Sequence, residues 1–185
     1  MNLLLHICCA PCLCWPHRTL EEEGIRFAGL WFNPTIHPYT EYRARRESLR
    51  QYAGSHALDV VYLDDYPLER TLAALAGERC AACYRIRLDR TARYAREHGF
   101  AAFSTTLLYS RYQRHDLVRE AGERAGREYN VQFSYRDFRT GWEQGRAMAR
   151  QLDLYRQKYC GCIFSERDRF FKPPAGGPDR SEPVS

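Results

Sequence analysis

The chain has 185 residues, of which 44% are hydrophobic and 28% are charged, and its formal net charge is +5 at pH 7. This length and composition predict one folded domain and exclude an intrinsically disordered chain. No stretch approaches about 18 consecutive apolar residues, and the N-terminus resembles no secretory signal, so we expect a cytoplasmic protein that does not bind membranes.

Short apolar runs alternate with helical patterns along the first half of the chain. We predict strands at residues 3–7, 25–32 and 58–63. We predict helices at residues 16–23, 38–51 and 68–75, the first of them ended by Gly24. The segment between Asn33 and Pro38 contains two prolines, which fix the backbone and predict a rigid loop.

The second half of the chain continues the same alternation. A helix is expected at residues 82–97, and strands are expected at residues 100–105 and 131–135. Capping-box spacing that starts at Ser110 and at Thr140 predicts two more helices, which run to about residues 127 and 152. Residues 172–185 are rich in proline and glycine and predict a flexible tail.

Strands that alternate with helices imply parallel pairing of the strands. We therefore predict an α/β fold with a Rossmann-like, doubly wound, mostly parallel sheet and helices on both faces. This single domain is expected to span residues 1–171. Folds of this kind place their ligands at the carboxyl ends of the strands.

The eight cysteines fall into three short-spaced groups rather than scattering along the chain. The groups are Cys8, Cys9, Cys12 and Cys14; Cys80 and Cys83; and Cys160 and Cys162. Thiols gathered in this way can share a metal or exchange electrons, and in a cytosolic protein they rarely form a disulfide framework.

Two of these groups together supply four sulfurs. Cys8 and Cys9 follow a predicted strand, whereas Cys80 and Cys83 have the spacing that puts both on one face of a helix start. An iron–sulfur cluster fits this set best, because a vicinal pair is awkward for one tetrahedral zinc ion. Zinc, a redox dithiol formed by Cys9 and Cys12, and inert buried thiols remain as alternatives.

Cys160 and Cys162 are separated only by Gly161, which permits a tight turn. A disulfide between them would be strained and easily reduced, as in an electron relay or a redox switch. The alternative is that one thiol binds metal while the other packs in the core.

Basic residues are almost all arginine, since only Lys158 and Lys172 are lysine among 28. They form two stripes with tyrosines nearby, which suits phosphates and unstacked RNA bases, although solvated helix faces give the same pattern. The stripes are Arg43, Arg45, Arg46 and Arg50, and Arg87, Arg90, Arg93 and Arg96. Motifs that cradle nucleotide phosphates are absent from the sequence.

Three polar residues are candidates for proton transfer. His115 and Asp116 could each donate a proton, as could His37, and Asp116 could alternatively ligate a metal. The simpler interpretation of Asp116 is an acidic residue in the first turn of a helix. His6 lies on an apolar strand and is expected to be a core histidine.

Several stretches together resemble the family of cobalamin-independent epoxyqueuosine reductases, the QueH type. They cover almost all of residues 3–169, and the tail lies outside the resemblance. The matching stretches are LLHICCAPC at 4–12, NPTIHPY at 33–39, RCAACYRIRL at 79–88, FSTTLLYS at 103–110, DFR at 137–139 and LYRQKYCGCIFS at 154–165.

The resemblance implies a reductase for the last step of queuosine synthesis, acting on the wobble nucleoside of tRNA with an unidentified electron donor. It implies a [4Fe-4S] cluster on Cys8, Cys9, Cys80 and Cys83. It also implies that Cys160 and Cys162 are a redox-active pair. Such proteins can also hold a second, mononuclear iron, for which Cys12 and Asp116 are candidate ligands on their chemistry alone. Cys14 has no assigned role. The arginine stripes are expected to bind the anticodon stem-loop, so that binding depends on salt.

Two rival functions follow from the residues alone. One is a zinc-stabilised RNA-binding module without catalysis, which would be colourless. The other is a thiol–disulfide oxidoreductase that uses Cys9 and Cys12 and needs neither Cys80 nor Cys83.

Overall fold

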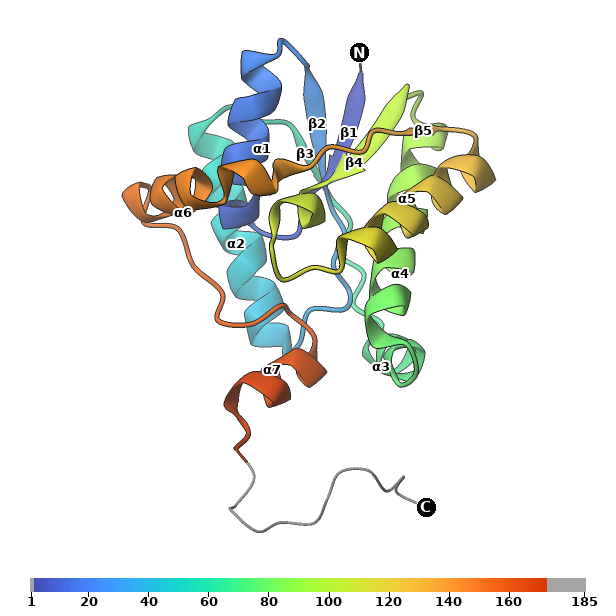
Figure 1. Cartoon of the computed structure of the whole chain (residues 1–185), viewed down its shortest axis with the longest axis vertical. Coiled ribbons are helices and arrows are strands. Elements are labelled where there is room, and N and C mark those ends of the chain that lie inside the picture. Colours follow the sequence, from blue (N-terminus) through green and yellow to red (C-terminus); the bar gives the residue numbers. More distant parts are fainter. Residues whose placement is uncertain (1, 173–185) are drawn as a thin grey trace.

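The structure, a computed structural model, describes residues 2–172, and within this range a five-stranded parallel sheet forms the centre of the molecule (Figure 1). Every pairing in the sheet is parallel, and the strand order is β3-β2-β1-β4-β5. The predicted doubly wound α/β fold is therefore confirmed. The strands are β1 (Leu3–His6), β2 (Phe27–Trp31), β3 (Val60–Tyr62), β4 (Ala102–Thr105) and β5 (Gln132–Phe133).

Helices connect the strands and cover both faces of the sheet. They are α1 (Ala10–Glu22), α2 (Tyr39–Ser55), α3 (Leu68–Leu75), α4 (Arg79–Glu97), α5 (His115–Tyr129), α6 (Trp142–Gln151) and α7 (Ile163–Phe170). Two short 3₁₀ helices, η1 (Thr106–Tyr109) and η2 (Phe138–Gly141), complete the set. None of the helices in residues 2–172 has the length and apolar character needed to span a membrane.

Strand β1 divides the core into two halves because its side chains alternate between the faces of the sheet. Leu3 and Leu5 pack in one buried cluster with residues of α1, α2 and α6. Leu4 packs in the other cluster with residues of α4 and α5. Figure 1 shows these two groups of helices on opposite sides of the strands. All of β1 is buried, which explains why its sequence is a continuous apolar run.

The sheet has its topological switch point at β1. This strand pairs with β2 on one side and with β4 on the other, in a register that sets His6 against Leu30 and against Thr105. The connections after β1 and β4 leave toward opposite faces, so a crevice opens at the carboxyl ends of these two strands. Cys8 and Cys9 follow β1 directly into this crevice.

Helix α1 begins at Ala10, well before the predicted start at Pro16. Cys9 has an extended backbone and precedes the first turn, and a proline occupies that turn. Proline is tolerated there because the missing N–H has no helical partner in any case. Cys12 and Cys14 consequently lie on a helix and point to different sides.

Both predicted capping boxes are wrong. Ser110 ends η1, and α5 starts only at His115, after Arg114. Thr140 lies within η2, and Gly141 precedes α6. Helix α4 starts at Arg79, before the predicted residue 82, and helix α7 was not predicted. The predicted tail, apart from Lys172, lies outside the described residues.

Gly145 of α6 tests how closely this helix must approach η1. A Cβ atom at Gly145 would lie 2.5 Å from the hydroxyl oxygen of buried Tyr109, whereas one at Gly54, in the last turn of α2, would meet nothing within 4 Å. We expect Gly145→Ala to lower the free energy of unfolding by about 1–3 kcal/mol through overpacking. Gly54→Ala should raise it by up to about 1 kcal/mol through helix propensity. Urea denaturation of both variants measures the difference, and equal effects would contradict the close packing of α6 on Tyr109.

Candidate metal centre

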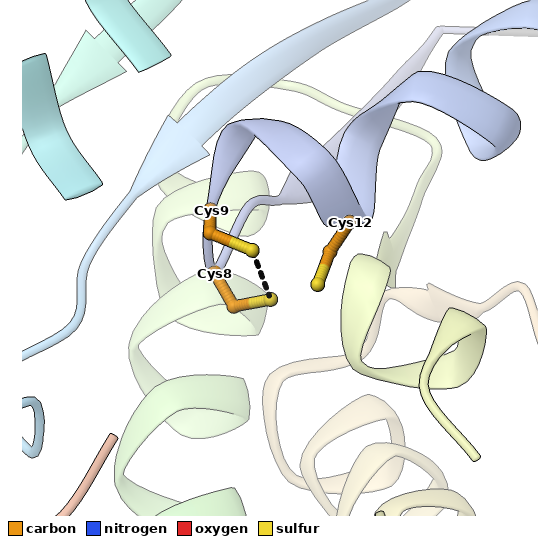
Figure 2. Close-up of side chains that lie close together, drawn as sticks. All are labelled: Cys8, Cys9 and Cys12. Atoms are coloured by element: carbon orange, nitrogen blue, oxygen red, sulfur yellow. Dashed lines mark hydrogen bonds between the residues drawn. The ribbon is translucent and has the colours of Figure 1, made fainter. Parts of the chain in front are cut away.

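Three buried thiols meet at the switch point of the sheet. The Sγ atoms of Cys8, Cys9 and Cys12, which we call the thiol trio, all lie within 4.8 Å of one another. Figure 2 shows their sulfurs converging where β1 passes into α1. Cys9 is the residue before the first helical turn, and Cys12 lies one turn further on. The sequence prediction that Cys8 and Cys9 form a donor pair is consistent with this geometry, and Cys12 joins them.

Hydrogen bonds within the trio favour one thiolate over three. The Thr106 hydroxyl lies 3.3 Å from Cys8 Sγ, and Cys8 Sγ lies 3.9 Å from Cys9 Sγ. Hydrogen bonds from the Cys12 and Cys9 thiols lower the pKa of Cys8 well below its ordinary value. Burial raises the pKa of Cys9, and the hydrogen bond to Cys8 raises that of Cys12. Cys8 is therefore the thiol of the trio that loses its proton most readily.

Cys80 and Cys83 lie in the first turns of α4, as predicted, but not within the tight trio. Half-buried Cys80 packs against the core cluster that contains the trio. Cys83 is buried with its Sγ 3.2 Å from the Thr35 hydroxyl oxygen, and burial raises its pKa. Cys83 also packs in a small cluster with Cys162. The second thiol pair thus borders the trio on one side and the Cys160–Cys162 region on the other.

Two arginines of the predicted surface stripes are buried beside these thiols. Arg45 and Arg87 are each only 2% exposed, and both line the same cavity as Cys8 and Cys12. Burial opposes the charge of Arg87, but the nearby Cys83, Cys160 and Cys8 raise its pKa overall. Its Nε and Nη2 atoms donate to the Thr35 hydroxyl at 3.0 and 2.7 Å. The prediction that Arg45 and Arg87 contact RNA phosphates is therefore wrong, because both side chains are buried and face the thiols.

Arg45 also fixes the segment that carries the Cys-x-Cys pair. Its Nε donates to Glu41 at 2.7 Å, while Nη1 and Nη2 donate to the carbonyl oxygens of Cys160 and Tyr159 at 2.9 and 3.0 Å. The Tyr155 hydroxyl donates to the same glutamate. One buried ion pair thus anchors the 155–162 segment, which has no regular secondary structure before α7.

Cys160 and Cys162 are free thiols, as are the other six cysteines. Cys160 lines the cavity, and Gln113 Nε2 donates to its Sγ at 3.2 Å. Protein atoms around this sulfur disfavour the thiolate and raise the pKa of Cys160 to about 11. Gly161 has a φ of +147°, a backbone region suited to glycine, which lets the two cysteines flank a sharp turn. Redox activity of this pair stays a prediction.

Gln157 connects the 155–162 segment to the trio, and the sequence patterns gave no role to this residue. Its Nε2 donates to Cys9 Sγ at 3.0 Å and lies 3.6 Å from Cys12 Sγ. Its Oε1 is buried and has no hydrogen-bond partner among the described residues. Because buried polar atoms are almost always satisfied, this oxygen is an acceptor that a bound ligand or water can use.

Two thiols of the trio and the thiol of Cys160 border a cavity of about 610 Å³. This volume lies within the range of about 300–1,000 Å³ found for pockets that enclose small-molecule ligands. Cys8, Cys12, Cys160 and Gln157 form part of its wall, and aromatic and basic side chains form the rest. The cavity can therefore hold an organic ligand in direct contact with thiols.

The other candidate residues lie elsewhere. His115 is buried, its Nε2 lies 3.2 Å from the Ser110 carbonyl oxygen, and burial lowers its pKa. Asp116 is exposed in the first turn of α5, where an acidic residue stabilises the helix dipole. Neither residue is in the cavity wall. Cys14 packs in the opposite core cluster with a pKa raised to about 12 by burial. His37 is likewise buried away from the cavity wall.

Fold and site together define a Rossmann-like α/β protein with a thiol-rich centre at the switch point of its sheet. Residues 3–168 match the family model described as epoxyqueuosine reductase QueH. The chain belongs to this family, whose members are oxidoreductases.

Relatives at moderate identity match nearly the whole chain. An epoxyqueuosine reductase QueH of Dehalococcoides mccartyi is 36% identical over 175 residues, which cover 93% of this chain and 96% of the relative. One of Thermotoga maritima is 33% identical, covering 91% of this chain and 92% of that protein. A crystal structure of a predicted tRNA methyltransferase subunit from Methanocaldococcus jannaschii shares the fold, with a TM-score of 0.54, 14% identity and coverage of 81% and 74%.

The Glu41–Arg45 pair has a close counterpart on the surface, which makes its role testable. Arg18 Nε lies 2.7 Å from Glu22, with the same spacing in a helix, but the two side chains are 54% and 57% exposed. We expect Arg45→Met to cost about 3–5 kcal/mol, because Glu41 is left buried and unpaired. Arg18→Met should cost at most about 1 kcal/mol.

Urea denaturation compares the two stabilities, and hydrogen exchange reports the 155–162 segment. Faster exchange of these amides is expected only in the Arg45 variant. Unchanged exchange there would show that Arg45 does not anchor the segment.

Proposed function

We propose that this protein is an epoxyqueuosine reductase that converts epoxyqueuosine to queuosine at the wobble position of tRNA. The reaction removes the epoxide oxygen with two electrons and two protons and yields an alkene and water. The observation that carries the proposal is the thiol trio, two of whose members, Cys8 and Cys12, line a ligand-sized cavity in a chain of this family. Since its substrate is tRNA, we place the enzyme in the cytoplasm, supplied by an electron donor that is not identified.

We further propose that Cys8, Cys9, Cys80 and Cys83 hold a [4Fe-4S] cluster. The donor set fits, because thiolates are the usual ligands of iron–sulfur clusters and buried Arg45 and Arg87 offset their negative charge. When bound, such a cluster supplies electrons at low potential. Cys12 lies close enough to the vicinal pair to act as a ligand, and we propose it for a second iron. Asp116 is exposed and does not line the cavity, so we do not propose it as a ligand of the second iron.

The Cys160–Cys162 pair matches the stoichiometry of the reaction. Oxidation of two thiols to a disulfide releases two electrons and two protons, which is the number that removal of the epoxide oxygen consumes. Cys160 faces the cavity and, with a pKa of about 11, keeps its proton at neutral pH. Cavity geometry therefore favours Cys160 over His115 and Asp116 as the nearby source of a proton.

One rival function has a structural observation in its favour. Cys9 and Cys12 are close enough to form a dithiol, as a thiol–disulfide oxidoreductase requires. Such an enzyme would reduce generic disulfides without iron and would tolerate the loss of Cys83. A zinc-stabilised RNA-binding module would instead be colourless and contain stoichiometric zinc.

The function is tested by mass spectrometry of tRNA nucleosides from cells that lack the gene. We expect epoxyqueuosine to accumulate and queuosine to return on complementation. A normal queuosine level in the deletion strain would overturn the proposal.

Serine variants test the cluster ligands. We expect Cys80→Ser and Cys83→Ser to lose most bound iron, the broad visible absorption of the anaerobically purified protein, and turnover. Cys14→Ser is the matched control, because Cys14 is a buried thiol of the opposite core and should keep all three properties. Iron analysis and absorption spectra give the readout. Full iron content in both α4 variants would remove these residues from the ligand set.

A further inference from the structure

Exposed cations gather at the mouth of the cavity. Arg150, Arg156, Lys158 and Arg169 all line the cavity and are exposed, and we call them the mouth cations. None of the four forms an ion pair within 4.0 Å in the part of the chain that the structure describes. Their positive charge is therefore available to a partner.

Six of the eight arginines in the predicted stripes are less available for binding. Arg46 and Arg50 pair with Asp64, and Arg90 and Arg93 pair with Glu97. Arg45 and Arg87 are buried among thiols, as described above. Charge that is neutralised or buried adds little to the attraction of a polyanion.

An exposed aromatic ring stands beside the mouth cations. Tyr112 lines the cavity with 82% of its surface exposed. Its ring and the Trp142 ring form a T-shaped pair, with centroids 5.6 Å apart and planes at 78°. The guanidinium groups of Arg111 and Arg146 lie 5.7 and 6.0 Å from the Trp142 ring centroid. The pair of rings thus forms an aromatic ledge flanked by two arginines, and these two arginines share one carboxylate, that of Glu143.

The backbone holds this ledge in place. Tyr112 N donates to the Ser110 hydroxyl at 3.2 Å, and Gln113 N donates to the Ser110 carbonyl at 3.3 Å. Gln113 in turn donates to Cys160, so the loop is tied to the cavity wall. An exposed ring on a fixed backbone loses little conformational entropy on binding, which favours a stacking role.

Cations beside an exposed ring, above a ligand-sized cavity, fit a single-stranded nucleic acid better than an acidic peptide, and the proposed function makes that nucleic acid RNA. Phosphates match the cations, an unstacked base matches the ring, and a base turned out of the loop matches the cavity. An acidic peptide would use the cations but leave the ring and the cavity empty.

We propose that the cavity mouth is the docking surface for the anticodon loop, with Tyr112 stacked on a base beside the modified nucleoside and the mouth cations on the flanking phosphates. This inference rests on the proposed function, since it takes the RNA to be tRNA. It replaces the two predicted stripes with a surface that adjoins the thiols.

Binding of a fluorescent, unmodified anticodon stem-loop RNA to the full-length, anaerobically purified protein tests the surface without turnover. Arg156→Gln removes one mouth cation. Arg93→Gln is the control, because Arg93 is exposed, pairs with Glu97 and is not in the cavity wall. We expect Arg156→Gln to weaken binding several-fold and to reduce the salt slope of log K by about 1. Arg93→Gln, with the same net charge, should leave both within twofold of the parent.

Tyr112→Leu and Tyr112→Phe separate stacking from hydrogen bonding by the hydroxyl. We expect Tyr112→Leu to weaken binding about tenfold or more and Tyr112→Phe to bind like the parent. A blunt RNA duplex without a loop should show no difference between these two variants.

Equal affinities and salt slopes for the Arg156 and Arg93 variants would contradict the proposed docking surface. Equal binding by the two Tyr112 variants would also contradict it. A different result is RNA binding that follows the expected pattern while cells that lack the gene keep normal queuosine. That result would support the docking surface and contradict the proposed reductase activity. The two failures are thus distinguishable.

Discussion

The buried guanidinium of Arg45 is the contact on which the site depends. It joins Glu41 of α2 to the carbonyl oxygens of Tyr159 and Cys160, residues more than 100 positions away. A buried arginine needs acceptors for its N–H groups, and the irregular 155–162 segment needs donors for its carbonyl oxygens. The hydrogen bonds between them satisfy both. The His37 amide, which donates to the Gly161 carbonyl at 2.7 Å, fixes the next residue in the same way. Polar contacts, more than apolar packing, bring Cys160 to the cavity.

Charge balance explains why arginines accompany the thiols. The interior strengthens electrostatic interactions, and a thiol that ionises there needs fixed positive charge nearby. Arg45 and Arg87 supply it from two different helices, α2 and α4, and Thr35 connects Arg87 to Cys83 through its hydroxyl. Arginine suits this position because its planar fork donates several hydrogen bonds while staying charged. The mouth cations, in contrast, face solvent and pair with no carboxylate among the described residues, so their charge is available to an anionic partner.

Much of the fold follows from local pattern, as particular elements show. The run at residues 3–7 is apolar because β1 is covered on both faces, and α3 has the predicted bounds of 68 and 75. Helix starts were harder to predict. Ser110 and Thr140 have capping-box spacing, yet Ser110 follows the 3₁₀ helix η1 and Thr140 lies within η2. A proline lies in the interior of α1, where its start was predicted. Spacing identifies residues able to cap a helix, but packing decides which of them do so.

The amino-acid sequence by itself determined the alternation of strands and helices, the parallel sheet and the grouping of the cysteines, because each depends on neighbours along the chain. Its resemblance to a known family also supplied the expected substrate. Only the tertiary structure decided that Cys12 joins Cys8 and Cys9, that Arg45 and Arg87 turn inward, and that Gln157 reaches Cys9 across 148 residues. These contacts arise where distant segments meet at the switch point of the sheet, and no local periodicity encodes which side chains face one another there.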